Sequence, residues 1–176
     1  MPIEPRPGVL PLRTEEDIAS KVHHAHEQEF ALILLKNPKI EFTYEPVKFI
    51  YQNGTRQFHL PDFGIRNLRT GVTTYLELTR APLAEFEIPR SEIEEHGEIP
   101  MGTYEPRGVR INEEGEELVK FASDPKARGR SMVAKVEEEL GENIPYYVLY
   151  KQQLQRIQDR HPERNLFAED EIPTRK

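Results

Sequence analysis

The sequence contains no cysteine, which excludes a disulfide framework, a thiolate metal site and a zinc finger. It also lacks a long apolar run, because the longest, residues 30–35, is far shorter than the roughly 20 residues that a membrane-spanning helix needs. No charged segment followed by an apolar one, as in a signal peptide, stands at the N-terminus. These absences predict a soluble, cytoplasmic protein with no membrane partner.

Basic residues are in deficit, since 24 Lys and Arg stand against 31 Asp and Glu and give a formal net charge of −7. Proteins that coat nucleic acid through bulk electrostatics use clustered Lys and Arg, so the balance argues against that class. The charges are unevenly placed, however. Residues 85–117 are strongly acidic and residues 126–130 are locally basic, so a basic patch is compatible with an acidic whole.

A chain of 176 residues fits one domain with an appendage. Residues 1–13 hold four prolines and predict an extended Pro-rich arm. Residues 14–160 are expected to form the domain, and residues 161–176 a polar tail. Within the domain, the proline, glycine and acid of residues 81–123 indicate an acidic insertion that serves as a lid or as a surface for a protein partner.

Helix and strand patterns alternate along the domain. A capping box at residues 14–17 predicts one long helix that ends at about residue 36. Further helices are expected at residues 124–140, with Asp124 as cap, and at residues 151–160. Strand patterns occupy residues 40–44, 47–51, 56–60, 72–79 and 144–150, of which the last is continuously apolar and predicts a buried strand. This order predicts an α/β (α+β) fold, a mixed central β-sheet flanked by helices.

Two carboxylates fall where two of these strands should meet. Asp62 follows an alternating run and a proline, and Glu77 lies inside the strand at residues 72–79. The turn residues at 67–71 predict a hairpin between them. The two acids then meet at one rim, which suits a hard divalent cation such as Mg²⁺ or Mn²⁺. The alternatives are a turn acid after proline for Asp62 and an exposed strand position for Glu77.

The first helix supplies two further acids. At 100° per residue, Glu27 falls beside Phe30 and Ala31, while Glu29 falls on the apolar stripe that includes Leu32. Most helical glutamates face solvent, but these apolar surroundings allow either acid to face inward.

In order and spacing, the residues His-Leu-Pro-Asp-Phe around Asp62 and Tyr-Leu-Glu-Leu-Thr around Glu77 resemble the PD-(D/E)xK nuclease superfamily. The resemblance is strongest to small bacterial nuclease-like domains whose last motif ends in Thr. Residues 42–46, Phe-Thr-Tyr-Glu-Pro, match a stretch that commonly precedes the Pro-Asp in this group. The similarity covers about residues 14–80 and 124–158. It implies a restriction-endonuclease-like core.

The resemblance also implies a function, a Mg²⁺- or Mn²⁺-dependent endonuclease that hydrolyses phosphodiester bonds in DNA. Asp62 would bridge the metal, and Glu77 and the Leu78 carbonyl would complete the protein ligands. Glu27 stands three residues ahead of a Phe-Ala pair, as the family's first-helix glutamate does, and would hold a water or a second ion. Glu29 remains the other candidate ligand from this helix.

One motif position departs from the family, because Thr79 stands where the motif lysine is expected. A neutral hydroxyl carries no positive charge at pH 7 to offset charge in the transition state. Some family members bring the basic group from the following helix, which makes Lys126 the candidate replacement. Arg128 and Arg130 from the same segment are candidate phosphate contacts.

Two other interpretations stay open. A catalytically inactive binding or assembly module would keep the fold and dock a basic partner through the acidic insertion, in keeping with the charge of −7. A metal-dependent phosphoesterase acting on small nucleotides would tolerate an acidic surface better than a DNA enzyme. The oligomeric state is open as well, with a homodimer among the options.

Overall fold

The computed structural model describes residues 2–53, 55–96 and 104–170. The helices and strands follow one another in the order β1 (Ile3–Pro5), α1 (Glu15–Lys21), α2 (Ala25–Leu35), β2 (Ile40–Tyr44), β3 (Val47–Asn53), β4 (Thr55–His59), β5 (Phe63–Asn67), β6 (Thr73–Leu78), β7 (Ala84–Pro89), α3 (Arg90–His96), β8 (Tyr104–Ile111), β9 (Glu117–Ser123), α4 (Ala127–Leu140), β10 (Tyr146–Leu149) and α5 (Lys151–Arg160). The fold is thus α+β, as predicted.

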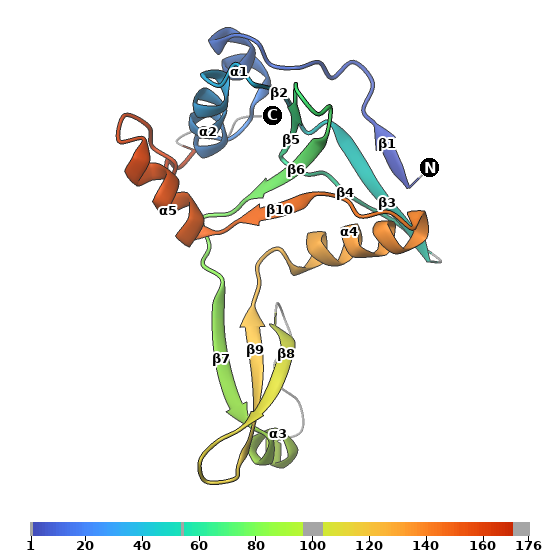
Figure 1. The fold of residues 1–176 in the computed structure, drawn as a ribbon, viewed down its shortest axis with the longest axis vertical. Coiled ribbons are helices and arrows are strands. Elements are labelled where there is room, and N and C mark those ends of the chain that lie inside the picture. Colours follow the sequence, from blue (N-terminus) through green and yellow to red (C-terminus); the bar gives the residue numbers. More distant parts are fainter. Residues whose placement is uncertain (1, 54, 97–103, 171–176) are drawn as a thin grey trace.

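A four-stranded sheet in the order β10-β6-β5-β2 forms the centre (Figure 1). Strand β6 pairs antiparallel with β5 and parallel with β10, so the sheet is mixed. The hairpin predicted between Asp62 and Glu77 is confirmed as β5–β6. The strand predicted at residues 72–79 lies inside the sheet, also as expected.

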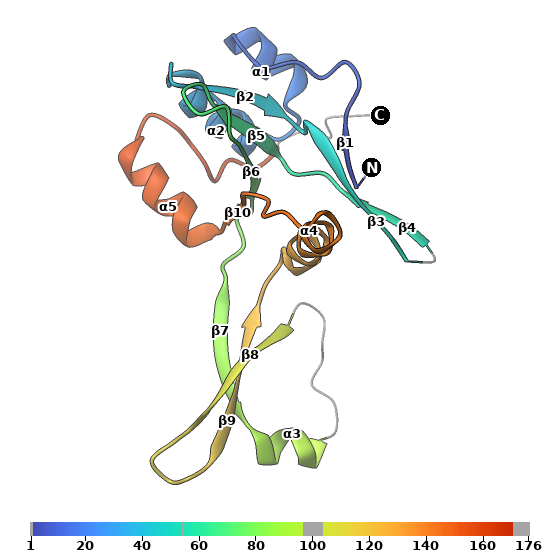
Figure 2. The same ribbon diagram turned by 45° about the vertical axis from the view of Figure 1, so that its right-hand side comes forward.

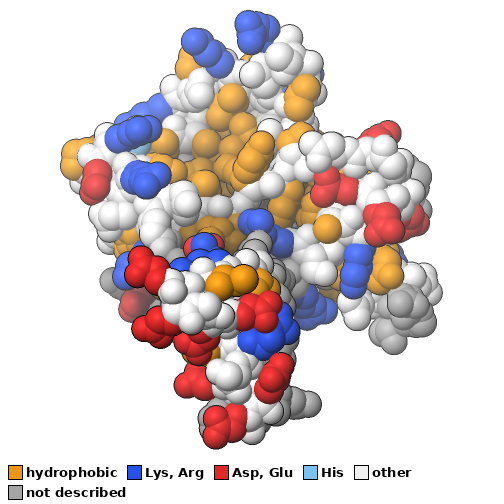
Figure 3. All heavy atoms as spheres, turned by 60° about the horizontal axis from the view of Figure 1, so that its bottom comes forward, with side chains coloured by type: hydrophobic (Ala, Val, Ile, Leu, Met, Phe, Trp, Pro, Cys, Tyr) orange, Lys and Arg blue, Asp and Glu red, His pale blue; other side chains and the backbone are white. Residues whose placement is uncertain are grey.

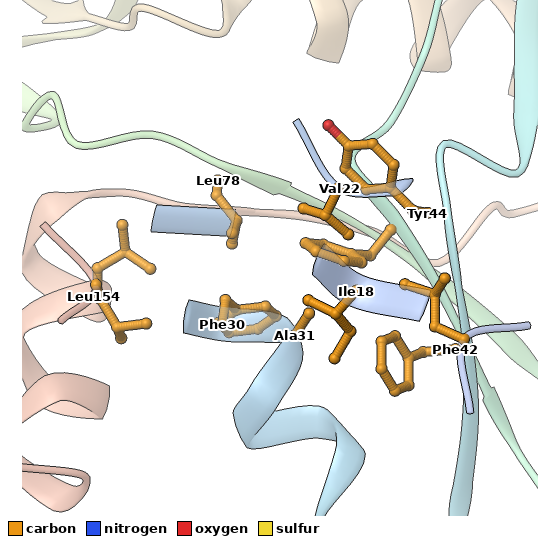
Figure 4. Packing of buried hydrophobic residues seen from close by; sticks show 11 residues of the cluster. Ile18, Val22, Phe30, Ala31, Phe42, Tyr44, Leu78 and Leu154 are labelled. Atoms are coloured by element: carbon orange, nitrogen blue, oxygen red, sulfur yellow. The ribbon is translucent and has the colours of Figure 1, made fainter. Parts of the chain in front are cut away.

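Helices α1, α2 and α5 pack against this sheet and enclose one hydrophobic core (Figure 4). The buried side chains come from α1 and α2, from β2 and β5, and from the C-terminal part of the chain, and include Ile18, Phe30, Ala31, Phe42, Phe63, Leu78, Leu154 and Leu166. In the described part of the chain, no helix is long and apolar enough to cross a bilayer.

A smaller sheet, β1-β3-β4, lies beside the central one. Strand β1 of the Pro-rich arm pairs with β3, and α4 packs on the sheet through Met132, Val133 and Val136. These side chains contact Val47 and Phe49, which face α4. A second core thereby fixes α4 next to the strands that lead to Asp62.

The prediction of one helix over residues 14–36 is wrong. The capping box at Thr14 forms as expected, but α1 ends at Lys21, and both Val22 and His24 adopt extended backbone before α2 begins. The break lets Val22 turn into the core, where it is 2% exposed. The β-branched side chain of Val22 also has a slightly lowered helix propensity, which is compatible with the break.

The strand predicted as buried, residues 144–150, is also different. Strand β10 lies at the edge of the central sheet, and Tyr147 is 60% exposed while Val148 is buried. Tyrosines combine an apolar ring with a polar hydroxyl and therefore suit an edge. The start of α4, the helix that precedes this strand, also differs from the prediction, since its N-cap is Lys126 and not Asp124.

Strands β7, β8 and β9 form a separate three-stranded sheet in the order β7-β9-β8, with α3 packed on it. We call β7, α3, β8 and β9 the projecting sheet, because it extends away from the core in both ribbon views (Figures 1 and 2). Acidic side chains gather on it (Figure 3). The projecting sheet follows β6 in the chain and precedes α4. The acidic insertion is therefore connected to the strand that carries Glu77 and to the helix whose N-cap is Lys126.

Residues 161–170, where the sequence indicated only a polar tail, pack back on the core. Leu166 is 1% exposed, and Asp170 accepts a hydrogen bond of 2.6 Å from the backbone N–H of Ala25. The Arg80 guanidinium donates to the Ala168 carbonyl at 2.9 Å. This segment therefore anchors the start of α2.

Candidate active site

The hairpin β5–β6 brings Asp62 and Glu77 together. Phe63 pairs with Leu76 in this ladder, so Asp62 and Glu77 face each other where the ladder ends. Pro61 is fully buried and Glu77 is 3% exposed. The two acids meet at an enclosed rim of the central sheet, in the arrangement that the sequence predicted.

The loop that carries Asp62 is tightly held. The Glu45 N–H donates to the Asp62 carbonyl at 2.8 Å, and Glu45 has the positive φ of 44° that its turn requires. Next to Asp62, a Cβ added at Gly64 would lie 2.8 Å from Pro46 Cγ. Only glycine fits this close approach, so Pro46 and Gly64 lock the loop against the β2–β3 turn.

The Asp62 carboxylate is in an unfavourable place for a negative charge. Its Oδ2 accepts the Leu78 N–H at 2.7 Å. Burial raises its pKa well above the usual range, and the neighbouring Glu77 and Glu27 raise it further, against the opposite effects of the Leu78 N–H and the Lys126 ammonium. A further cation beside Asp62 would therefore favour the ionised form of this carboxyl group.

Glu27 from α2 completes a cluster of three acids, which we call the acid cluster: Glu27, Asp62 and Glu77. Its Oε1 accepts a 2.7 Å hydrogen bond from the Tyr44 hydroxyl, and its carboxyl is hydrogen-bonded to Asp62. Burial raises the pKa of Glu27. Glu29 lies elsewhere, with Oε2 3.3 Å from Arg164 Nη1. Of the two candidate glutamates, α2 brings only Glu27 to the site.

Three side chains converge on Glu77. His59 Nε2 lies 2.7 Å from its Oε2, and the Tyr146 hydroxyl donates to the same oxygen at 3.1 Å. Lys126 Nζ lies 3.7 Å from Oε1. The carboxylate is therefore oriented on one oxygen by His59 and Tyr146 and faces a positive charge on the other.

Lys126 reaches the acids from the start of α4. Asp124 Oδ1 accepts the Lys126 N–H at 2.9 Å and the Tyr150 hydroxyl at 2.8 Å. Burial and, as the second cause, the hydrogen bond to Asp124 raise the pKa of Tyr150 to about 12. Asp124 is fully buried, so this turn gives the Lys126 backbone a fixed position. Thr79, at the motif position, uses its hydroxyl within the local turn, because its Oγ1 accepts the Ala81 N–H at 3.1 Å.

The two arginines of α4 separate. Arg128 is exposed and lines a depression together with Lys126 and His59. Arg130 lies 3.5 Å from Asp124 Oδ2 through its Nε and donates to the Tyr150 hydroxyl. Arg128 is thus free to meet a phosphate beside the acid cluster, while Arg130 supports the Asp124 turn.

Four residues that support the acids could not be identified from the sequence: Tyr44, His59, Asp124 and Tyr146. In the sequence His59 alternates with the apolar Phe58 and Leu60, and Tyr146 is one of three tyrosines in residues 144–150, so neither stands out as a site residue. Their contacts with Glu77 depend on strand pairing over long sequence distances, which periodicity does not show.

No group of three or more His, Asp or Glu side chains that could hold a metal ion is present in residues 2–53, 55–96 and 104–170. Comparisons with protein families, curated proteins and solved structures give no match for this chain. The functional interpretation therefore depends on the residues of the site.

Proposed function

We propose that the protein is a Mg²⁺- or Mn²⁺-dependent nuclease that hydrolyses phosphodiester bonds in DNA, with a core related to that of the PD-(D/E)xK enzymes. One observation carries the proposal. The partly buried Asp62 and the buried Glu77 lie at neighbouring positions of one hairpin, and the Lys126 ammonium lies 3.7 Å from Glu77 although the motif position itself is Thr79.

Asp62 and Glu77 suit a hard divalent cation. Their donors are carboxylate oxygens, and because burial, followed by the neighbouring Glu77 and Glu27, raises the pKa of Asp62, a cation beside Asp62 would offset negative charge. Asp62, Glu77 and the Leu78 carbonyl would hold the ion. Mg²⁺ is commonly bound by one or two carboxylates, with water and phosphate oxygens in the other positions. When bound, such an ion supplies a nucleophile near neutral pH and offsets charge on the phosphate.

The chain's own residues have separable roles. The Leu78 N–H fixes one oxygen of Asp62, and the Tyr44 hydroxyl fixes one oxygen of Glu27. Lys126 replaces the missing lysine, because its ammonium can stabilise the additional negative charge on the phosphate in the transition state. Arg128 would hold a neighbouring phosphate. The acids and the Lys126 ammonium are thus preorganised before substrate binds.

A DNA substrate is compatible with the net charge of −7. Many of the acids lie on the projecting sheet, where Glu87 and Glu85 are already paired with Arg110 and Lys120. The start of α4, in contrast, presents Lys126 and Arg128 next to the active site. The local field at the site, not the sum over the chain, acts on the scissile phosphate.

A catalytically inactive binding module is the second candidate. The observation in its favour is Thr79, whose hydroxyl accepts a backbone hydrogen bond and carries no positive charge. In such a module the acid cluster would bind a cation without cleavage of DNA. Lys126 is the residue that separates the two candidates.

The test is a plasmid-nicking assay with Mn²⁺ or with EDTA. The wild-type protein should nick DNA only with the metal. Lys126→Ala should lower the rate by about 10² or more, the effect expected when one preorganised transition-state contact is lost. Lys135→Ala is the matched control, since Lys135 lies on the same helix but sits over the Tyr51 ring, 4.7 Å from its centroid.

Asp62→Asn, purified in the same way, guards against a contaminating nuclease and should be inactive. Full activity in Asp62→Asn, or an equal loss in Lys126→Ala and Lys135→Ala, would contradict the proposal. Wild-type protein that binds Mn²⁺ but leaves all DNA intact would favour the binding module.

A further inference from the structure

Strand β8 is an edge strand of the projecting sheet (Figure 1). Within the described part of this sheet, β8 pairs with β9 alone. The Asn112 N–H donates to the Glu116 carbonyl at 3.0 Å, which sets the phase of the β8–β9 ladder. Hydrogen-bonded and non-hydrogen-bonded pairs alternate along an antiparallel ladder. The backbone N–H and C=O groups of Val109 and Ile111 therefore point away from β9, toward the open edge.

The side chains of the same two residues are apolar and open to solvent. Val109 is 50% exposed and Ile111 is 71% exposed. Val109 pairs with the buried Val119, so the apolar face of the sheet is buried at β9 and open at β8. Helix α3 contacts β7 and β9. Exposed β-branched side chains beside outward-pointing backbone groups are what a strand from another chain can pair with.

The charge of the projecting sheet indicates the kind of chain that would pair there. Residues 84–123 hold 11 of the 31 acids but only 4 of the 24 bases, so the rest of the chain holds 20 of each and is neutral. The whole net charge of −7 thus lies in this segment. Glu113 and Glu114, in the turn that follows β8, are exposed and form no ion pair with any described residue. Uncompensated acid beside an open edge favours a basic partner.

A second copy of this chain suits the edge less well. Two projecting sheets joined through β8 would bring two equal surpluses of acid together, and like charges oppose association. The ladder is irregular between Pro106 and Gly108. Proline and a bulge restrict pairing along an edge, so the regular part of β8 offers a short stretch that fits a single extended segment.

We propose that β8 accepts an extra strand from a basic protein, an extended segment in which apolar side chains alternate with Lys or Arg. The backbone of this segment pairs with Val109 and Ile111, and its apolar side chains cover theirs. Its cations lie near Glu113 and Glu114. This interaction is separate from the nuclease function, because β8 contributes no residue to the active site.

The test measures the binding of a fluorescein-labelled peptide of alternating Lys and Val by anisotropy, in EDTA and without DNA. Wild-type protein should bind this peptide more tightly than a peptide of alternating Glu and Val. A Lys–Val peptide that is N-methylated at alternate amides keeps its charge but cannot donate hydrogen bonds to β8. It should bind about tenfold more weakly, as expected when backbone hydrogen bonds are lost.

A double variant tests the charge contacts. Glu113→Gln with Glu114→Gln should weaken binding by about fivefold, because two exposed ion pairs are lost. Glu138→Gln with Glu139→Gln is the matched control, since it makes the same change in charge at two adjacent exposed positions of α4. This control should bind the Lys–Val peptide as the wild type does.

A single variant tests the apolar contact. Ile111→Thr keeps a β-branched side chain but removes apolar surface, and should weaken binding by about fivefold. Val72→Thr makes a similar change at an exposed position just before β6 and should leave binding unchanged. Thermal melts verify that each variant folds.

Several results would overturn the proposal. They are the absence of peptide binding, equal binding of the Lys and Glu peptides, undiminished binding of the N-methylated peptide, and equal losses in the two double variants. A wild-type dimer in sedimentation that Ile111→Thr dissociates would also overturn it, since a second copy would then occupy the edge. None of these measurements depends on cleavage, so failure of the nuclease proposal and failure of this one are distinguishable.

Discussion

Replacement of Gly129 by alanine tests the packing of the active site without removal of any polar group. Gly129 lies in the first turn of α4, below His59 and Tyr146. A Cβ at this position would lie 2.8 Å from His59 Cε1, 2.9 Å from His59 Nε2 and 3.1 Å from the Tyr146 hydroxyl. The methyl group therefore presses on the two side chains that orient Glu77.

Two opposing effects set the magnitude. Alanine is favoured over glycine by at most about 1 kcal/mol in a helix. Overpacking costs about 1–3 kcal/mol. The His59 ring has little room to move, since Glu77 Oε2 lies 2.7 Å from its Nε2 and the Phe49 ring is stacked on it with centroids 6.5 Å apart. Overpacking should win by about 1 kcal/mol, which lowers Tm by about 2–4 °C in a chain of this length.

The assay combines thermal unfolding with the nicking rate. Gly129→Ala should lower both, because displacement of His59 and Tyr146 disorients Glu77. Ser131→Ala is the control, at an exposed position on the same helix, and should leave both unchanged. In a double mutant with His59→Ala, the added methyl should cost less than it does alone, since the clash has gone. A Gly129→Ala protein more stable than the wild type would refute the packing of His59 against α4.

Two further predictions concern charge. Because the folded-state pKa of Asp62 is raised, this group stabilises the metal-free fold most below its unfolded pKa of about 4, and that stability is lost as pH rises through the raised value. Asn at this position does not titrate, so the Tm of Asp62→Asn relative to that of the wild type, both in EDTA, should increase with pH. A difference in Tm that stays constant with pH would contradict this prediction. Asp124→Asn weakens the turn that positions Lys126, so it should slow nicking while Mn²⁺ affinity, measured by calorimetry, stays unchanged; equal losses of both would show that Asp124 acts on the whole site.

The hairpin that carries Asp62 and Glu77 could be predicted because its signals are local. Alternation, the turn residues 67–71 and the position of each acid all lie within one short stretch. The same holds for the helix stop at Gly141, whose φ of 68° needs glycine.

Other features depend on tertiary contacts that no local pattern contains. No glycine or proline marks the break between α1 and α2, at which Val22 is buried in the core. The strands of the projecting sheet were not predicted, because the prolines, glycines and acids of residues 81–123 outweighed a short alternation such as Val119 and Phe121, both buried in β9. The contact of His59 with Glu77 required the mutual arrangement of the two sheets.

The binding of Mn²⁺ to the metal-free protein, measured by isothermal titration calorimetry, tests the proposed metal site most directly. Wild-type protein should bind the ion and release protons, since the cation counteracts the raised pKa of Asp62. Asp62→Asn should weaken binding by more than about tenfold, because loss of even an outer-shell partner costs about that much. Glu29→Gln, at the glutamate that faces Arg164, should bind as the wild type does. Equal affinity in wild type and Asp62→Asn would contradict the site.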